Sequence, residues 1–312
     1  MSTDTGKTSI TSRNPGRVAR ERLYRYVLFL CAGLSVVVTL SIVVMLLWNA
    51  MDFFTFVDPL AFFAGTEFSL APGREQYGIL PLLSGTILVT VISALIALPV
   101  GLSAAVYLSE YASDRARSVL KPSLEILAGI PTVVYGIFAL HYVTPFLRIF
   151  GLPLNTFNVL SASVMVGIMI IPMVSSLSED AMSAVPDSLR QAGYGMGATK
   201  FEVSTGVVIP AAVSGIFSSF ILALSRAIGE TMIVAVAMGS RSRLIDFGEP
   251  LSNLWQANQP MTAAMVQING ADNVSGTAFT SMFAIGLTLF AITFLMNLAS
   301  NRIAARYREE YE

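Results

Sequence analysis

Long apolar segments constrain this chain more than any other feature. They cover residues 26–48, 79–110, 124–143, 159–177, 207–238 and 279–299. The hydrocarbon core of a bilayer is about 30 Å thick, so about 20 apolar residues in a helix cross it. Only 12% of the 312 residues are charged, roughly half the fraction of an average soluble domain. The sequence therefore predicts an all-α, polytopic membrane protein with six transmembrane helices.

The flanking segments predict the orientation. We expect residues 1–25 to form a basic cytoplasmic tail, residues 26–300 the transmembrane domain, and residues 301–312 a second cytoplasmic tail. With the N-terminus inside, the inner segments hold fourteen Lys and Arg residues and the outer loops hold four. Because inner loops carry the excess of basic residues, both termini are predicted to be cytoplasmic.

One basic and one acidic residue lie inside the fifth apolar segment. Arg226 precedes Met238 by 12 residues, about 18 Å along a continuous helix, which places it near the middle of the bilayer. An arginine there costs about 2.5–3.5 kcal/mol on insertion scales. Glu230 follows four residues later, so we expect the two side chains to pair on one helix face. Charges inside a membrane usually mark a substrate path, although a pair that only fixes helix packing is the alternative.

Small residues recur every fourth position in two of the apolar segments. Such stripes let helices approach closely in lipid, so both are predicted to be packing surfaces. The stripes are Ser93, Ala97, Gly101 and Ala105, and Gly215, Ser219, Ala223 and Ala227.

The stretch from Pro186 to Pro210 is the longest polar interruption between apolar segments. Proline suits the first turn of a helix and Asp187 suits its N-terminus. Leu189, Ala192 and Met196 then repeat at helical spacing, which predicts a short amphipathic helix. The positive-inside orientation places this stretch in the cytoplasm.

Several chemistries have no matching pattern in the sequence. The only Gly-Lys pair, Gly6-Lys7, lacks the glycine spacing of a phosphate-binding loop, and neither a zinc-protease helix nor a nucleophile elbow is present. One cysteine and one histidine do not make a metal site. We therefore expect no enzymatic activity, no cofactor and no metal, and the near-zero net charge gives no reason to expect nucleic-acid binding.

Part of the polar stretch resembles the "EAA" signature of ATP-binding-cassette importer permeases. The matching residues are Gln191-Ala192-Gly193, then Gly197, then Val207, Ile209 and Pro210. Gln191 replaces the usual Glu and Gly193 replaces the second Ala. The resemblance implies a coupling loop at about residues 178–206 that docks on a cytoplasmic ATPase. The implied contact residues are Asp187, Leu189, Gln191, Ala192, Gly193, Gly197 and Pro210.

A wider set of segments resembles the permeases of the phosphate-specific importer, and the PstC-type family in particular. The set is YGILPLLSGTILVTVISALIALPVGLSAAVYLSEYA, LAGIPTVVYG and SRAIGETM. The resemblance implies a type I importer permease of the bacterial inner membrane, with Arg226, Glu230 and Thr231 on the substrate path. The implied partners are a homologous PstA-type permease, a cytoplasmic ATPase dimer that hydrolyses ATP, an extracytoplasmic phosphate-binding protein, and phosphate.

Three other functions stay open at this point. The chain could be the permease of an importer for another oxyanion, such as sulfate or molybdate. It could be a secondary transporter driven by ions, with Arg226 and Glu230 used in proton or anion exchange. It could also be a membrane scaffold or sensor that transports nothing.

The predicted orientation can be tested by labelling single cysteines in a Cys31→Ala background. Arg115 lies in a predicted inner segment and Glu67 in a predicted outer one. An impermeant thiol reagent added from outside should label a cysteine at position 67 and not one at position 115. Labelling of position 115 from outside would overturn the orientation.

Overall fold

Two compact units make up the chain. The computed structural model describes residues 15–71, 73–271 and 276–306. The first unit ends at Trp48 and the second begins at Asn49. The first unit is the N-terminal part of one helix, α1 (Pro15–Phe56), whose described side chains are exposed from Arg20 to Ile42.

Helix α1 begins before the first predicted apolar segment, because residues 15–25 already belong to it. Proline is tolerated in the first turn, and the Arg, Glu and Leu residues that follow are good helix formers. Residues 1–14 lie outside the described part of the chain.

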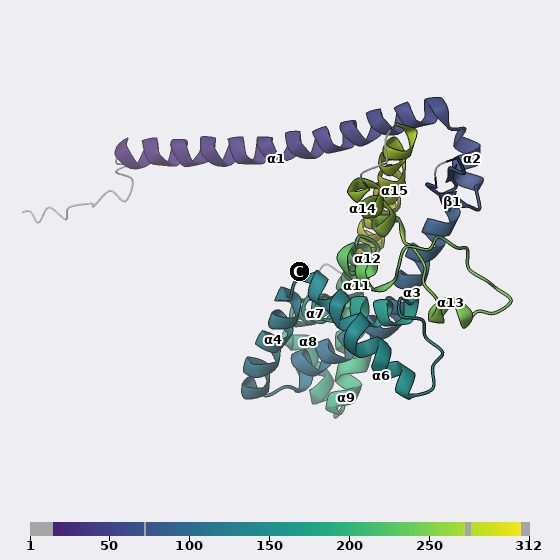
Figure 1. Cartoon of the computed structure of the whole chain (residues 1–312). Coiled ribbons are helices and arrows are strands. Elements are labelled where there is room, and N and C mark those ends of the chain that lie inside the picture. Colours follow the sequence, from purple (N-terminus) through teal and green to yellow (C-terminus); the bar gives the residue numbers. More distant parts are fainter. Residues whose placement is uncertain (1–14, 72, 272–275, 307–312) are drawn as a thin grey trace, which may run out of the picture. The chain divides into compact units, whose positions relative to one another are not determined.

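The second unit is almost entirely helical (Figure 1). Its elements are the end of α1, α2 (Pro59–Ala64), β1 (Phe68–Ser69), β2 (Gln76–Tyr77), α3 (Leu80–Val106), η1 (Tyr107–Tyr111), α4 (Asp114–Gly129), α5 (Thr132–Phe138), η2 (Ala139–Val143), α6 (Thr144–Ile149), α7 (Val159–Ser183), α8 (Asp187–Gly195), α9 (Lys200–Val203), η3 (Ser204–Val208), α10 (Ile209–Ala211), α11 (Val213–Ile228), α12 (Met232–Ala237), α13 (Ser252–Trp255), α14 (Met261–Gly270) and α15 (Thr277–Arg306). The η elements are π-helical. The strands form one short antiparallel hairpin.

The described residues contain five helices that are long and apolar enough to cross a membrane, or six if one bent pair counts as a single span. The predicted all-α polytopic class is confirmed. The last span, Thr277–Ser300, agrees with the predicted segment at residues 279–299, and α15 continues beyond it to Arg306. Residues 301–306 are therefore helical, and residues 307–312 lie outside the described part.

The third span begins later than predicted. Residues 124–129 belong to α4, which buries none of its residues, and the membrane-length segment is Thr132–Ile149. Proline disfavours the helical conformation of the residue before it. Ile130, which precedes Pro131, accordingly adopts an extended conformation (φ −69°, ψ 130°) and ends α4.

The fifth apolar segment is broken twice, and the prediction of one continuous helix over residues 207–238 is wrong. Lys200–Ala211 and Val213–Ile228 meet at a 70° bend. A second break separates the end of α11 from the start of α12 at residues 229–231. Glycine ends α11 at position 229, since its lack of a side chain makes it a weak helix former.

Helices α3 and α7 form the centre of the second unit. The predicted stripe on α3 is buried at all four positions, which confirms it as a packing surface. Ser93 donates a hydrogen bond across the contact to the Ser163 carbonyl oxygen at 2.9 Å. On α11, Ser219, Ala223 and Ala227 are buried, and the Ser219 hydroxyl lies 2.8 Å from that of Ser178 on α7.

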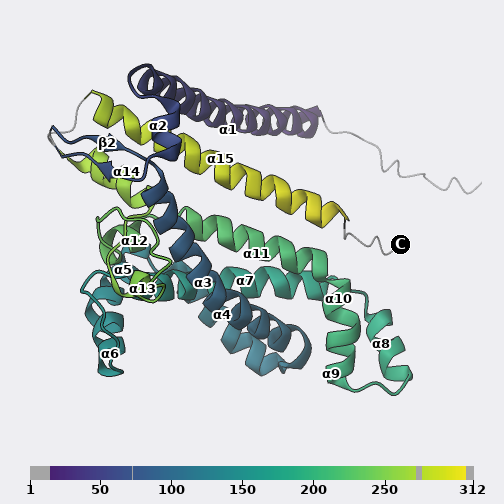
Figure 2. The same ribbon diagram turned by 90° about the vertical axis from the view of Figure 1, so that its right-hand side faces the viewer.

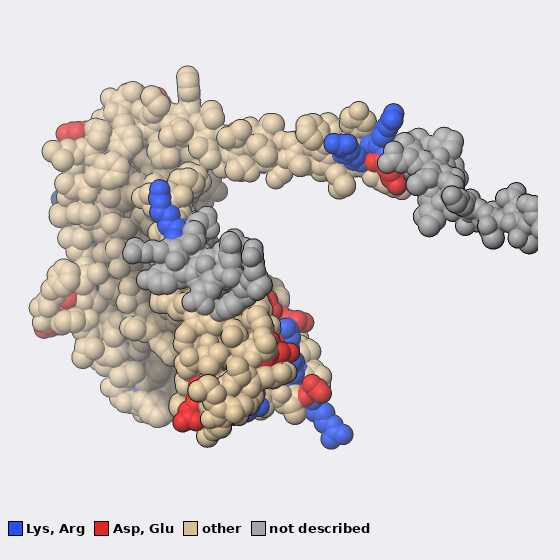
Figure 3. Space-filling model, turned by 180° about the vertical axis from the view of Figure 1, so that it is seen from behind, with Lys and Arg blue, Asp and Glu red and all other residues tan. Residues whose placement is uncertain are grey.

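Opposite ends of the second unit carry different features. The β1–β2 hairpin lies at one end, and α8 and α9 lie side by side at the other (Figure 2). Acidic and basic side chains gather over the end that carries α4, α8 and α9 (Figure 3). The polar stretch identified in the sequence is thus separated from the hairpin by the α3–α7 core.

Gly101 tests the α3–α7 contact. A Cβ at this position would lie 2.7 Å from the Val174 side chain, whereas a Cβ at helical Gly206 would meet nothing within 4 Å. We expect Gly101→Ala to destabilise the protein by about 1–3 kcal/mol through overpacking. Gly206→Ala should be neutral or stabilising by up to about 1 kcal/mol. Thermal unfolding in detergent measures both, and equal melting temperatures for the two variants would contradict close packing here.

Candidate functional site

The second break in the fifth apolar segment places two charges at helix ends. Arg226 lies in the last turn of α11, where the carbonyl groups favour a cation. Glu230 lies just before α12, and its Oε1 accepts hydrogen bonds from the Met232 and Ile233 amides at 3.0 and 3.1 Å. A carboxylate at a helix N-terminus is favourable for the same electrostatic reason.

Arg226 and Glu230 do not pair, so the predicted contact is wrong. The (i, i+4) geometry holds only in a continuous helix, and Gly229 interrupts it. Glu230 is buried, and its carboxylate accepts hydrogen bonds from the α12 backbone. Arg226 makes no hydrogen bond or ion pair with any residue that the structure describes.

Thr231 and Thr262 hold the break in place. The Thr231 hydroxyl donates to the Gly229 carbonyl oxygen at 3.1 Å. Thr262, on α14, donates to the Glu230 carbonyl oxygen at 2.8 Å. These hydroxyls satisfy carbonyl groups that the interrupted helix leaves free.

Arg226 lines a cavity of about 420 Å³ between α4, α7 and α11. Most of the lining is apolar. The polar and charged members are Lys121, Glu125, Ser176, Glu179 and Arg226. A water molecule takes up about 30 Å³ of liquid, so the cavity has room for a small hydrated anion. Glu230 and Thr231, which were predicted to share this path, do not line it.

The polar stretch forms a compact helix–turn–helix. Gly197 has a left-handed conformation (φ 84°), and its amide donates to the Tyr194 carbonyl oxygen while the Ala198 amide donates to that of Gly193. This pair of bonds is a Schellman motif, which ends α8 and favours glycine at position 197. Thr199 and Glu202 then form a capping box that begins α9.

The predicted coupling residues divide between the surface and the interior. Asp187, Gln191, Ala192, Gly197 and Pro210 are exposed. Leu189 instead packs against a buried apolar cluster, and a Cβ at Gly193 would lie 2.9 Å from Val203. These two residues therefore hold α8 against its neighbours.

Apolar side chains are also exposed on this unit. Met196, in the turn after α8, is 89% exposed, and Phe201, on α9, is 67% exposed. Exposed apolar groups beside a polar rim are typical of protein-binding surfaces.

Arg190 fastens α8 to two other helices. Its guanidinium donates to Glu110 Oε1 (3.4 Å from Nε and 3.1 Å from Nη2), to the carbonyl oxygens of Val185 (2.6 Å) and Met182 (2.8 Å), and to Asp187 Oδ1 (3.2 Å). These contacts use all five N–H groups of an arginine. Both Arg190 and Glu110 are largely withdrawn from solvent, with side chains 14% and 4% exposed. The Met182 carbonyl belongs to the last turn of α7, the Val185 carbonyl belongs to the segment between α7 and α8, and Glu110 belongs to η1.

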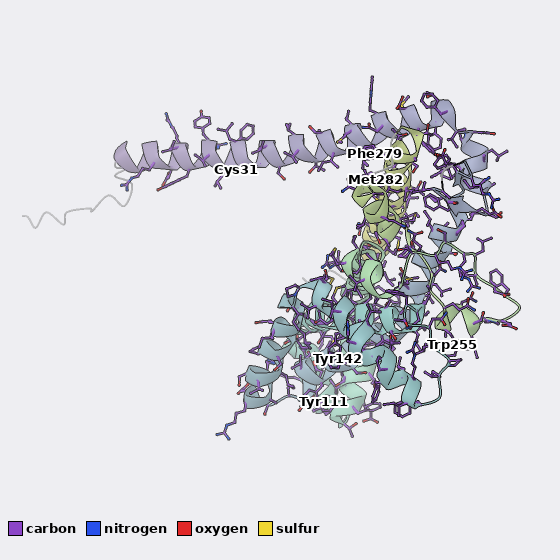
Figure 4. The ribbon with its side chains drawn as sticks, in the orientation of Figure 1. Cys31, Tyr111, Tyr142, Trp255, Phe279 and Met282 are labelled. Atoms are coloured by element: carbon purple, nitrogen blue, oxygen red, sulfur yellow. The ribbon has the colours of Figure 1, made fainter. Side chains whose placement is uncertain are left out.

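A second contact joins α9 to η1. The Lys200 ammonium lies 5.2 Å from the ring centroid of Tyr111, which Figure 4 labels at the end of the unit that carries α9. A cation over an aromatic face is favourable by about 0.5–1 kcal/mol at exposed sites.

Residues 97–309 match the family of binding-protein-dependent transport system inner membrane components. The chain belongs to this family. It is 32% identical over 307 residues to the phosphate transport system permease protein PstC of Xylella fastidiosa strain Temecula1, covering 91% of each chain. It is 32% identical over 268 residues to the PstC protein of Mesorhizobium japonicum, covering 80% of this chain and 78% of the relative. A probable ABC transporter permease protein of Bacillus subtilis, YqgH, is 29% identical and covers 90% of each chain.

Two solved structures share the fold. The bacterial alginate ABC transporter in complex with its pentasaccharide-bound periplasmic protein aligns with a TM-score of 0.64 at 14% identity, covering 93% of this chain and 96% of that one. The inward-facing MetNI methionine transporter aligns with a TM-score of 0.54 at 19% identity, covering 74% and 95%. Both confirm the importer permease architecture. The chain is a multi-pass permease subunit of an importer.

The sequence analysis of this permease missed Arg190, Glu110, Lys121 and Glu179. Arg190 and Lys121 belong to the fourteen basic residues of the predicted inner segments, and nothing in the local sequence distinguishes them from the other twelve. A signal for Glu110 was present, since an acidic residue at the end of a long apolar helix needs a partner when buried. Its partner lies 80 residues away, however, and nothing in the sequence connects the two positions.

Arg190→Lys tests the attachment of α8. Lysine has three donors in place of five and cannot reach Glu110 and two carbonyl groups together. We expect faster hydrogen exchange of the α8 amides, with protection lowered by about 1–3 kcal/mol. Arg115→Lys on α4 is the matched control. Arg115 is exposed, so this substitution should leave the exchange of the α8 amides unchanged. Equal exchange of α8 in both variants would contradict the fastening role.

Proposed function

We propose that this permease is a subunit of an ATP-driven importer of inorganic phosphate, in which Arg226 contacts the anion on its path. The observation that carries this proposal is Arg226 itself, which pairs with no described residue, ends an interrupted helix, and lines a cavity large enough for the anion. Relatives at 32% identity are named as phosphate permeases, which supports phosphate as the substrate.

The chemistry of Arg226 fits a tetrahedral oxyanion. A guanidinium presents planar, paired donors and keeps its charge at every physiological pH. Interrupted helices in transporters commonly place their ends at the substrate. Glu230 and Thr231 act on this path indirectly, because they fix the break that ends α11 beside Arg226.

The proposed partners follow from the family and from the surfaces described above. A cytoplasmic ATPase dimer docks on α8, the Gly197 turn and α9, through the exposed Asp187, Gln191 and Ala192 and the exposed apolar groups. A PstA-type permease completes the path, and an extracytoplasmic phosphate-binding protein delivers the anion. Five basic residues lie on α4, α8 and α9, namely Arg115, Arg117, Lys121, Arg190 and Lys200, which supports a cytoplasmic position for these helices. The proposed location is the bacterial inner membrane, with both termini in the cytoplasm.

Phosphate uptake into vesicles tests this function. We expect Arg226→Leu to lower uptake by about ten- to a hundredfold, the scale of losing a hydrogen bond to a charged group. Arg226→Lys should also impair uptake, because a point charge does not reproduce the paired donors. Glu230→Gln should do less harm, since an amide oxygen still accepts the α12 N–H groups. Arg115→Leu is the control for removing a cation elsewhere.

The same assay separates the alternatives. Uptake must need the ATPase and the binding protein, and equal rates without them would favour an ion-driven transporter. Uptake of sulfate in preference to phosphate would favour another oxyanion importer. Full uptake by an assembled Arg226→Leu complex would reject the role of Arg226.

A further inference from the structure

A second cation lines the Arg226 cavity. Lys121 on α4 borders the cavity, and it also borders a groove on the outer surface of α4, together with Asp114, Arg117 and Ser118. Lys121 therefore stands between the interior of the cavity and the surface at the end of the molecule that carries α8 and α9. An anion that leaves Arg226 toward that surface passes this ammonium group.

Glu179 on α7 is the present partner of Lys121. Its Oε2 lies 3.2 Å from Lys121 Nζ, and its Oε1 lies 3.9 Å from Arg117 Nε. The Glu179 side chain is only 5% exposed, and Oε2 receives no hydrogen bond of normal geometry. The contact between Lys121 and Oε2 is therefore an ion pair that lacks hydrogen-bond geometry.

The two cations beside Glu179 differ in how firmly they are held. Arg117 donates to the Leu108 carbonyl oxygen at 3.2 and 2.6 Å and to that of Ser109 at 3.3 Å. Lys121 makes no hydrogen bond with any described residue, and its side chain is 40% exposed. A lysine ammonium on a flexible stem can change partner, whereas Arg117 stays beside Glu179 and keeps the carboxylate neutralised.

We propose that Lys121 is a second anion-binding group on the path. When no anion is present, its ammonium group pairs with the Glu179 carboxylate. This inference rests on the proposed role of the Arg226 cavity. An oxyanion that has left Arg226 competes with Glu179 for Lys121, binds the ammonium, and is released when the carboxylate takes Lys121 back. Glu179 thus prevents the anion from being retained at the mouth of the cavity.

Transport kinetics of the assembled importer in proteoliposomes test the proposal, with inorganic phosphate as the probe. Lys121→Met keeps the stem and removes the charge, and we expect it to lower the maximal rate about tenfold. The phosphate concentration for half-maximal rate should stay unchanged, because the anion enters the path elsewhere. Lys121→Arg should retain most of the rate. Arg115→Met, on the exposed face of the same helix, should transport normally.

The double variant Lys121→Met with Glu179→Gln decides between transport and structure. If the pair only fastens α4 to α7, removing both charges together should be mild, because neutral replacement of an ion pair is often tolerated. If Lys121 binds the anion, the double variant should be as slow as Lys121→Met. Glu179→Gln alone should also be slow, since the freed lysine holds the anion.

Complex yield and an Arg226→Leu arm complete the design. Normal transport by the assembled double variant would overturn the inference about Lys121. The proposed role of Arg226 would still stand if Arg226→Leu transports slowly. Normal transport by Arg226→Leu would instead reject the proposed function itself. Should Lys121→Met fail to assemble, Glu179→Gln still decides, because a normal maximal rate for that variant overturns the inference.

Discussion

Close contact between α3 and α7 is the constraint on which the rest of the structure depends. Small side chains on α3 remove the bulk that would keep the two backbones apart, and Gly101 leaves no room for a Cβ against Val174. The contact brings the end of α3 beside the end of α7, so Glu110 and the Met182 carbonyl reach the same guanidinium. It also fixes Glu179 on the wall of the Arg226 cavity. Without this contact, neither the attachment of α8 nor the cavity would have its present shape.

The parts of the fold that depend on local sequence were predictable. The length of the apolar segments identified the membrane spans. Small residues at every fourth position identified the packing face of α3. The polar stretch after Pro186 was correctly expected to form a short helix. Each of these signals is periodic and lies within about 30 residues, so propensity and periodicity are sufficient to reveal it. Gly197 belongs to the same group, because a glycine just after a helix commonly adopts the left-handed conformation found here.

The arrangement of the charges was not predictable in the same way. Arg226 and Glu230 have the spacing of an ion pair on one helix, but a single glycine between them ends the helix and sends each charge to a separate helix terminus. Two other buried carboxylates have ion-pair partners far away in sequence: Glu110 binds Arg190, and Glu179 binds Lys121. Such pairs depend on tertiary contacts, and periodicity carries no information about them. The sequence therefore identified Arg226 as a residue of interest and gave it the wrong partner.

One turn of π-helix joins the proposed docking surface to the mouth of the cavity. Helix η1 ends at Tyr111, so the carbonyl groups of Leu108 and Ser109 lack partners within the helix, and Arg117 of α4 supplies them. The next residue, Glu110, binds Arg190 of α8. Three consecutive residues thus hold the helix on which the ATPase is proposed to dock and the helix that carries Lys121. Packed side chains, hydrogen bonds and rigid helices of this kind are the structures that carry energetic coupling between distant sites in proteins. Because Arg190 binds Glu110 of η1 as well as the Met182 and Val185 carbonyl groups, α8 cannot shift without breaking these bonds unless η1 and the end of α7 move with it.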